Sequence, residues 1–216
     1  MDGNNRWSKK NNIAIYNGYK KGAKQLVNLT NFIFTNTNSN YVSAFALSKN
    51  NLNRSKRLIS ILKNLLLEFI DEINNEKLSL DFNIKFVGDK SFLDKNINKK
   101  INLIENTVNK NKKFLLIYIN YSGKDDIKQA AYNYYLVSSV SKKNKYKFED
   151  FLLTKNFPDP DILVRTGGYS RLSDFIIYQS TFTELFFSNK LWPDFKISDL
   201  SNIINKYYSL ERKFGL

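Results

Sequence analysis

Short runs of strand-forming residues alternate along this chain with longer segments whose apolar residues recur at helical spacing. The predicted strands cover residues 41–47, 82–88, 114–120 and 161–166, and the predicted helices cover 22–34, 57–73, 91–111, 125–141 and 198–213. Strands that are separated by helices of this length pair in parallel. The order therefore predicts an α/β fold with a central, mostly parallel sheet flanked by helices.

In such a sheet, ligands bind where loops leave the carboxyl ends of the strands. The segment 48–54 follows the first predicted strand, and the segment 166–171 follows the last. The chain has 216 residues, 42% of them hydrophobic, and it contains neither an internal repeat nor a linker. We therefore expect one domain over residues 1–216.

Cysteine and histidine are both absent from the sequence. Without them the chain has no disulfide, no thiolate or imidazole metal site, and no Ser-His or Cys-His nucleophile. Acid–base or metal chemistry must use Asp, Glu, Tyr, Lys or amide groups. We find no signal-peptide pattern and no apolar run near the roughly 20 residues of a membrane helix, so we expect a soluble, cytoplasmic protein.

The formal charge of +14 comes almost entirely from lysine, because only six of the 34 basic residues are arginine. The lysine excess accompanies many Asn and Ile residues and fits an AT-rich coding sequence, so we expect no nucleic-acid partner. Arg6, Arg165 and Arg171 lie close to glycines in short polar stretches. A guanidinium grips phosphate oxygens in pairs, so these stretches favour bound phosphate over surface ion pairs.

Three blocks of sequence resemble a known family. They are "MDGNNRW" at 1–7, "SKNNLNR" at 48–54 and "DILVRTGGYSRLSDFIIYQSTFTELFFSNKLWPDF" at 161–195, and the match ends in "ERKFG" at 211–215. In these blocks the chain resembles the cis-prenyltransferases, whose best-known members are undecaprenyl diphosphate synthases. The resemblance implies a homodimer around a parallel sheet, a Mg²⁺-dependent diphosphate site and a hydrophobic tunnel for the growing chain.

The first block resembles the family's site for the allylic diphosphate. Asp2 matches the Asp that holds Mg²⁺ on that diphosphate and is central to catalysis. One Asp is chemically enough, because substrate phosphates complete the metal's oxygen shell. The resemblance also implies a loop that wraps the diphosphate, with Trp7 next to it; the loop residues are Gly3, Asn4, Asn5 and Arg6. The residues alone leave open that Asp2 is a turn residue and Trp7 a core anchor.

The third block resembles the family's grip on the diphosphate of the second substrate, isopentenyl diphosphate. The matching residues are Arg165, Arg171, Leu172 and Ser173. Glu184 matches a second metal-site carboxylate, and in such dimers the C-terminal segment of one subunit can complete the site of the other. Without the resemblance, Glu184 is interpreted as a buried polar residue of an apolar helix. Residues 192–194 also match, and we expect them to shape a turn and an interface.

The second block resembles positions close to the reacting carbons. Ser48 and Asn51 match these positions, and Arg54 matches a phosphate-binding Arg. The resemblance implies that Asn51 accepts a proton. Because an amide is a weak base, we interpret its role as proton relay or orientation.

The chain departs from the family pattern near the allylic site. Ile15 stands where the family has an Arg, Tyr19 a His, Asn50 a Glu, Leu52 a Trp and Tyr169 a Glu. We keep Tyr19, Asn50 and Leu52 among the expected substrate-binding residues. A Gly-Tyr pair at this point is similar to the lavandulyl-type members, which couple two five-carbon allylic diphosphates irregularly. The departures predict altered product choice and mainly short products.

We therefore expect a Mg²⁺-dependent prenyl diphosphate synthase that condenses an allylic diphosphate with isopentenyl diphosphate, with peripheral membrane contact through its product. The alternatives within the fold are irregular coupling of two dimethylallyl diphosphates and long-chain undecaprenyl diphosphate synthesis. Other classes are a non-catalytic subunit that lends Glu184 to an active partner, and a basic protein that binds RNA or an anionic membrane. Family members have an apolar strand just before the opening block, so we expect that the natural reading frame begins upstream or that the chain is trimmed.

Overall fold

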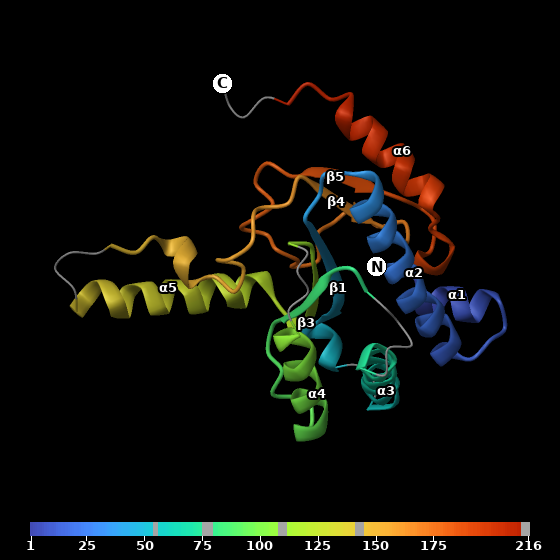
Figure 1. Cartoon of the computed structure of the whole chain (residues 1–216), viewed down its shortest axis with the longest axis horizontal. Coiled ribbons are helices and arrows are strands. Elements are labelled where there is room, and N and C mark those ends of the chain that lie inside the picture. The colour runs from blue at the N-terminus through green and yellow to red at the C-terminus, as the bar shows by residue number, and fades with distance from the viewer. Residues whose placement is uncertain (54–55, 75–79, 108–111, 141–144, 213–216) are drawn as a thin grey trace.

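Strand β3 (Phe114–Tyr121) is the central strand of a three-stranded sheet (Figure 1). It pairs in parallel with β1 (Tyr41–Ser48) on one side and with β2 (Asn83–Val87) on the other. Helix α3 (Lys56–Asn74) connects β1 to β2, and α4 (Lys95–Asn106) connects β2 to β3. The predicted α/β fold with a parallel sheet flanked by helices is thus confirmed. The computed structural model describes residues 1–53, 56–74, 80–107, 112–140 and 145–212.

The side chains of β3 alternate between two cores. Leu115, Ile117 and Ile119 belong to the larger core, which also contains residues of β1, β2 and the helices α2 (Ile15–Asn36), α3 and α4. Leu116 and Tyr118 belong to a second core on the opposite face, together with residues from β4 and the segment after it. Both faces of β3 are therefore buried, which explains why this strand appears in the sequence as a continuous apolar run.

A second sheet consists of the parallel strands β4 (Ile162–Arg165) and β5 (Glu184–Phe187). The interpretation of Glu184 as part of a helix was wrong. The four residues of β5 alternate between half-buried and exposed positions, which is the period of a strand. The expectation of one central sheet also changes, because β4 and β5 pair with each other rather than with β1–β3.

Helices account for most of the remaining chain. The opening block was expected to be a loop, but Asn4–Lys10 forms the short helix α1. Helix α5 (Gly123–Val140) extends away from the sheets, and α6 (Ile197–Tyr208) lies near β4 and β5 (Figure 1). Short turns of 3-10 helix are η1 (Lys49–Asn53), η2 (Phe148–Phe151) and η3 (Trp192–Asp194). Within the described segments, none of the helices combines the length and apolar character that crossing a membrane requires.

Gly22 of α2 lies where this helix packs against both α1 and η3. The indole N–H of Trp192 donates a hydrogen bond to the carbonyl of Gly22 at 2.8 Å. A Cβ atom on Gly22 would lie 2.3 Å from Asn4 Oδ1 and 2.9 Å from Trp192 Cδ1. The missing side chain therefore lets α1 and the indole ring approach α2 closely.

Gly22→Ala is expected to lower the free energy of unfolding by about 1–2 kcal/mol, because overpacking against a ring outweighs the better helix propensity of alanine. Urea unfolding measures the change. The control Asn17→Ala, at an exposed position of the same helix, should stay within about 0.5 kcal/mol. Equal effects of the two substitutions would contradict the tight contact.

Candidate active site

The carboxylate of Asp2 lies between two guanidinium groups. Arg6 Nη2 donates to Oδ1 at 3.3 Å, and Arg165 Nη2 donates to Oδ2 at 3.0 Å. Arg165 is the last residue of β4, so it lies at the carboxyl end of a parallel strand. The structure therefore brings together candidate residues from the first and third sequence blocks.

The second terminal nitrogen of Arg165 contacts the loop that follows β4. Its Nη1 donates to Ser173 Oγ at 2.6 Å and to the backbone carbonyl of Arg171. The Arg165 side chain is only 13% exposed, whereas Arg171 is exposed and Leu172 packs against the second core. A guanidinium that is bonded on both sides is held in one orientation, as recognition of phosphate by a planar fork requires.

The backbone of Asp2 is fixed by two distant loops. The backbone N–H of Asp2 donates to Thr166 Oγ1 at 3.0 Å, and the backbone carbonyl of Asp2 accepts a hydrogen bond from the backbone N–H of Trp192 at 2.9 Å. Gly167 has a φ of +92°, and a Cβ atom there would lie 2.6 Å from Arg6 Nη2. Glycine is thus required for the turn and for the close approach of Arg6.

Asp174 anchors the loop that carries Arg171 and Ser173 to the start of α5. Its carboxylate accepts hydrogen bonds from Ser122 Oγ at 2.6 Å and from the Lys124 N–H at 2.8 Å. A carboxylate is favourable at the beginning of a helix, where N–H groups have no helical partner. The sequence analysis missed this residue, although an Asp directly after a matched Ser was a signal.

The first-block residues after Gly3 lie in the first turn of α1. Asn4 and Asn5 have buried Oδ1 atoms that find no hydrogen-bond partner among the described residues. The Asn4 oxygen is packed against Gly22 of α2. Trp7 is buried and donates its indole N–H to Asp194 Oδ1 at 2.7 Å. These are the contacts of a core anchor.

The second block lies at the carboxyl end of β1, as predicted. Ser48 ends the strand, and Asn50, Asn51 and Leu52 belong to η1. Lys49 Nζ bonds to Asp125 Oδ2 at 2.6 Å, which ties η1 to α5. This hydrogen bond raises the pKa of Lys49 and lowers the pKa of Asp125. Leu52 packs against the larger core, as does Met1. The candidate residue Arg54 lies outside the described residues.

Tyr19 is half-buried on α2. A cluster of polar side chains near it connects α2 to α3. The Tyr16 hydroxyl donates to Glu68 Oε2 at 2.5 Å, and Lys20 Nζ donates to the same oxygen at 2.9 Å. The bonds from Tyr16 and then from Lys20 lower the pKa of Glu68. These hydrogen bonds therefore tie α2, the helix that carries Tyr19, to α3.

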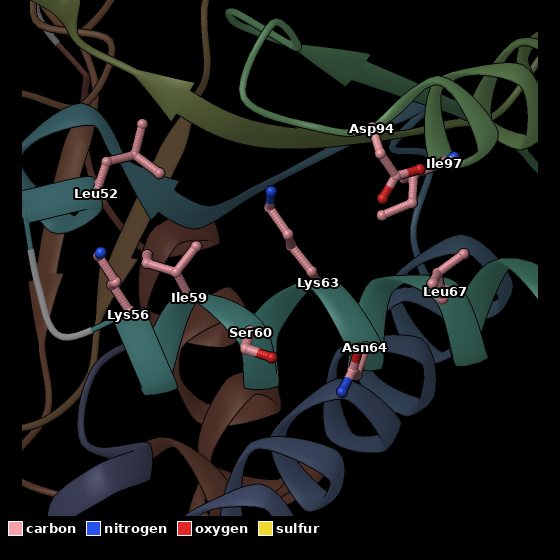
Figure 2. A pocket seen from close by; sticks show the side chains of 9 residues that line it. All are labelled: Leu52, Lys56, Ile59, Ser60, Lys63, Asn64, Leu67, Asp94 and Ile97. Carbon is pink, nitrogen blue, oxygen red and sulfur yellow. Dashed lines mark hydrogen bonds between the residues drawn. The ribbon is translucent and has the colours of Figure 1, made fainter.

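A pocket of about 370 Å³ lies along α3, between this helix and the beginning of α4 (Figure 2). Its lining mixes apolar and polar side chains: Leu52, Lys56, Ile59, Ser60, Lys63, Asn64, Leu67, Asp94 and Ile97. Lys63 donates to the Phe92 carbonyl at 2.6 Å. The pocket is lined by residues of η1, α3 and the beginning of α4. The hydrophobic tunnel that the resemblance implies stays a prediction.

Glu184 lies at the other end of the β4–β5 pair from Arg165. It is opposite Ile162 in the register, whereas Arg165 is opposite Phe187. Its Oε1 is 4.0 Å from Arg212 Nε. Within one chain the structure therefore places Glu184 with Arg212 rather than with Asp2, and its role at a metal site stays a prediction.

Comparisons with known proteins cover almost the whole chain. A family model described as "Putative undecaprenyl diphosphate synthase" matches residues 1–215. The "Isoprenyl transferase" of Thermotoga maritima is 33% identical, and the alignment covers 100% of this chain and 94% of that protein. The "(2Z,6Z)-farnesyl diphosphate synthase CPT6, chloroplastic" of Solanum lycopersicum is 34% identical, and the alignment covers 100% of this chain and 76% of that protein.

The fold has a close counterpart among solved structures. Lavandulyl diphosphate synthase from Lavandula x intermedia, in complex with dimethylallyl diphosphate, matches with a TM-score of 0.90 and 28% identity, covering 100% of this chain and 95% of that chain. The family model, the relatives and the solved structure agree, and the chain therefore belongs to the cis-prenyltransferase family of enzymes.

Proposed function

We propose that this cis-prenyltransferase condenses an allylic prenyl diphosphate with isopentenyl diphosphate in a Mg²⁺-dependent reaction and releases a short product. The observation that carries the proposal is the Asp2 carboxylate held between Arg6 and Arg165. A carboxylate that can bind a cation and guanidiniums that can bind phosphate oxygens are the groups that a diphosphate requires.

The arginines form two proposed diphosphate-binding sites, here called grips, and the Asp2 carboxylate contacts an arginine of each. Arg6, on α1, belongs to the grip proposed for the allylic diphosphate, with the backbone of Gly3–Asn5. Arg165, Arg171 and Ser173 form the grip proposed for isopentenyl diphosphate, and the contact of Arg165 with Ser173 supports this grouping. Two diphosphates held next to each other bring their reacting carbons together, which lowers the entropic part of the barrier.

Asp2 is the residue that would hold Mg²⁺. Its side chain is 38% exposed and therefore accessible to a cation. In the described part of the chain, Asp and Glu side chains form no group of three or more that could enclose a metal by themselves. The donor set thus fits Mg²⁺, which is commonly bound by one or two carboxylates together with substrate phosphates. When bound, Mg²⁺ neutralises charge on the leaving diphosphate.

The reaction starts when the carbon–oxygen bond of the allylic diphosphate breaks and negative charge grows on the leaving group. Arg6, which belongs to the proposed allylic site, stabilises this charge from a fixed position. The double bond of isopentenyl diphosphate then attacks the allylic cation, a carbon–carbon bond forms and a proton leaves the product. We assign Asn51 to orienting or relaying this proton, and Leu52 to excluding water from the cation.

A second candidate reaction is the irregular coupling of two dimethylallyl diphosphates. It is favoured by the TM-score of 0.90 with lavandulyl diphosphate synthase, whose solved structure contains dimethylallyl diphosphate. Tyr19 in a Gly-Tyr pair and Asn50 in place of a carboxylate also favour this candidate. Long-chain undecaprenyl diphosphate synthesis is the other reaction within the family.

We also propose a cytoplasmic homodimer that contacts membranes through its prenyl product. In this assembly Glu184 would serve the site of the second copy. The position of Glu184 next to Arg212, away from the Asp2 carboxylate of its own chain, supports this arrangement.

Asp2→Ala should lower turnover by two orders of magnitude or more, because the proposed metal anchor is lost. Steady-state assays with an allylic diphosphate and isopentenyl diphosphate measure the effect. EDTA should abolish the activity and added Mg²⁺ should restore it. The control Asp71→Ala removes a carboxylate paired with Lys100 and should leave turnover unchanged. Full activity in EDTA would reject the metal.

Arg165→Lys or Arg171→Lys should weaken the binding of isopentenyl diphosphate about tenfold or more, because lysine keeps the charge but loses the paired, charge-assisted hydrogen bonds. Binding to heparin should hardly change. Arg57→Lys, at an exposed position of α3, is the matched control for both measurements. An equal loss of affinity for isopentenyl diphosphate and for heparin would indicate a general anion-binding surface.

Tyr19→His should move the product distribution toward regular elongation, because it restores the imidazole that the family pattern has at this position. Radiolabelled isopentenyl diphosphate with dimethylallyl, geranyl or farnesyl diphosphate, followed by product chain-length analysis, measures the distribution. The unmodified protein should give mainly short products. A long-chain polyprenyl diphosphate as its dominant product would contradict the proposal.

A further inference from the structure

The ring of Tyr169 contacts the three candidate-site arginines that the structure describes, Arg6, Arg165 and Arg171. The guanidinium carbon of Arg171 lies 4.2 Å from the ring centroid, that of Arg6 5.0 Å and that of Arg165 5.6 Å. A guanidinium within about 6 Å of an aromatic ring is attracted by the negative face of the ring. Tyr169 therefore joins side chains that come from α1, from β4 and from the loop after β4.

The position of this ring is set by the backbone before it. The Gly167 N–H donates to the Lys190 carbonyl at 2.7 Å, and the Gly168 N–H donates to the Ser188 carbonyl at 2.9 Å. Both glycines have positive φ angles, +92° and +80°, which favour glycine over residues with a side chain. The turn directs the chain so that the next residue, Tyr169, meets the guanidiniums.

The Tyr169 ring can attract guanidinium groups without adding a negative charge to the site, which a carboxylate in the same place would do. Three guanidiniums close together repel one another, and among these three arginines the Asp2 carboxylate pairs with Arg6 and Arg165 but not with Arg171. An aromatic ring attracts the third guanidinium as well, yet it carries no net charge that would repel a diphosphate. Tyr169 therefore gathers the arginines and leaves their positive charge available to an anionic ligand.

We propose that Tyr169 is a positioning residue for diphosphate binding, which acts by holding Arg6, Arg165 and Arg171 toward a common ligand. The inference rests on the proposed function, because it takes the ligands to be diphosphates. It adds a residue that belongs to neither grip but contacts both.

Isothermal titration with inorganic pyrophosphate and with isopentenyl diphosphate tests the proposal in Tyr169→Leu and Tyr169→Phe. Loss of the ring in Tyr169→Leu should raise both dissociation constants about fivefold, and Tyr169→Phe should stay within about twofold, because the ring face rather than the hydroxyl makes the contacts. In turnover assays, KM for isopentenyl diphosphate should rise in Tyr169→Leu while kcat stays within about twofold. Tyr135→Leu, at a position 68% exposed on α5, is the matched control and should change nothing.

A double-mutant cycle with Arg171→Met shows whether Tyr169 acts through the arginines. If it does, the effect of Tyr169→Leu on pyrophosphate binding should shrink when Arg171 is already absent. Unchanged binding in Tyr169→Leu, loss in Tyr169→Phe equal to that in Tyr169→Leu, or full additivity with Arg171→Met would overturn the proposal. Absence of turnover with every allylic donor would instead reject the proposed function, and the pyrophosphate titrations would still decide the role of Tyr169.

Discussion

The candidate site depends on keeping three guanidinium groups close together against their mutual repulsion. Two unit charges at short separation repel by several kcal/mol at the dielectric of a protein surface, so their positions must be held by other groups. The Asp2 carboxylate, the Arg171 carbonyl, the Ser173 hydroxyl and the Tyr169 ring do this. Only one of these four groups is an anion. The cluster therefore keeps a positive charge, and it contains three of the six arginines of the chain.

Much of the scaffold could be predicted from the sequence, because two of its strands, β2 and β3, are buried on both faces. The run at 114–120 was predicted as a strand, and the structure shows that both of its faces are buried. Helix α1 and strand β5 could not be predicted in the same way. Both are very short, and both owe their conformation to partners far along the chain: α1 packs against α2 and η3, and β5 is fixed by its pairing with β4.

Sequence motifs identified candidate residues of the site more readily than they identified which side chains contact one another there. Arg165 and Ser173 were matched as one grip, and the structure shows the hydrogen bond between them. Trp7 was matched in the same way, and the structure shows its ring buried with the indole N–H bonded to Asp194. Asp174 and Tyr169 show the converse, because neither was assigned a role from the motif although both organise the loop that carries Arg171. The sequence gives residue type and order, whereas these roles depend on which side chains meet across loops.

The hydrogen bonds of Asp2 also constrain when the site can form. Its backbone is bonded to Thr166, which lies 164 positions further along the chain, and to Trp192, which lies still further. Contacts of such sequence separation are slow to form, because a large loop must close before they contribute. During synthesis, Asp2 must wait until residues 166 and 192 have left the ribosome before these partners exist. An incomplete chain can build the parallel sheet β1–β3 but not the carboxylate and arginine cluster, so the diphosphate site should be among the last parts of the molecule to assemble.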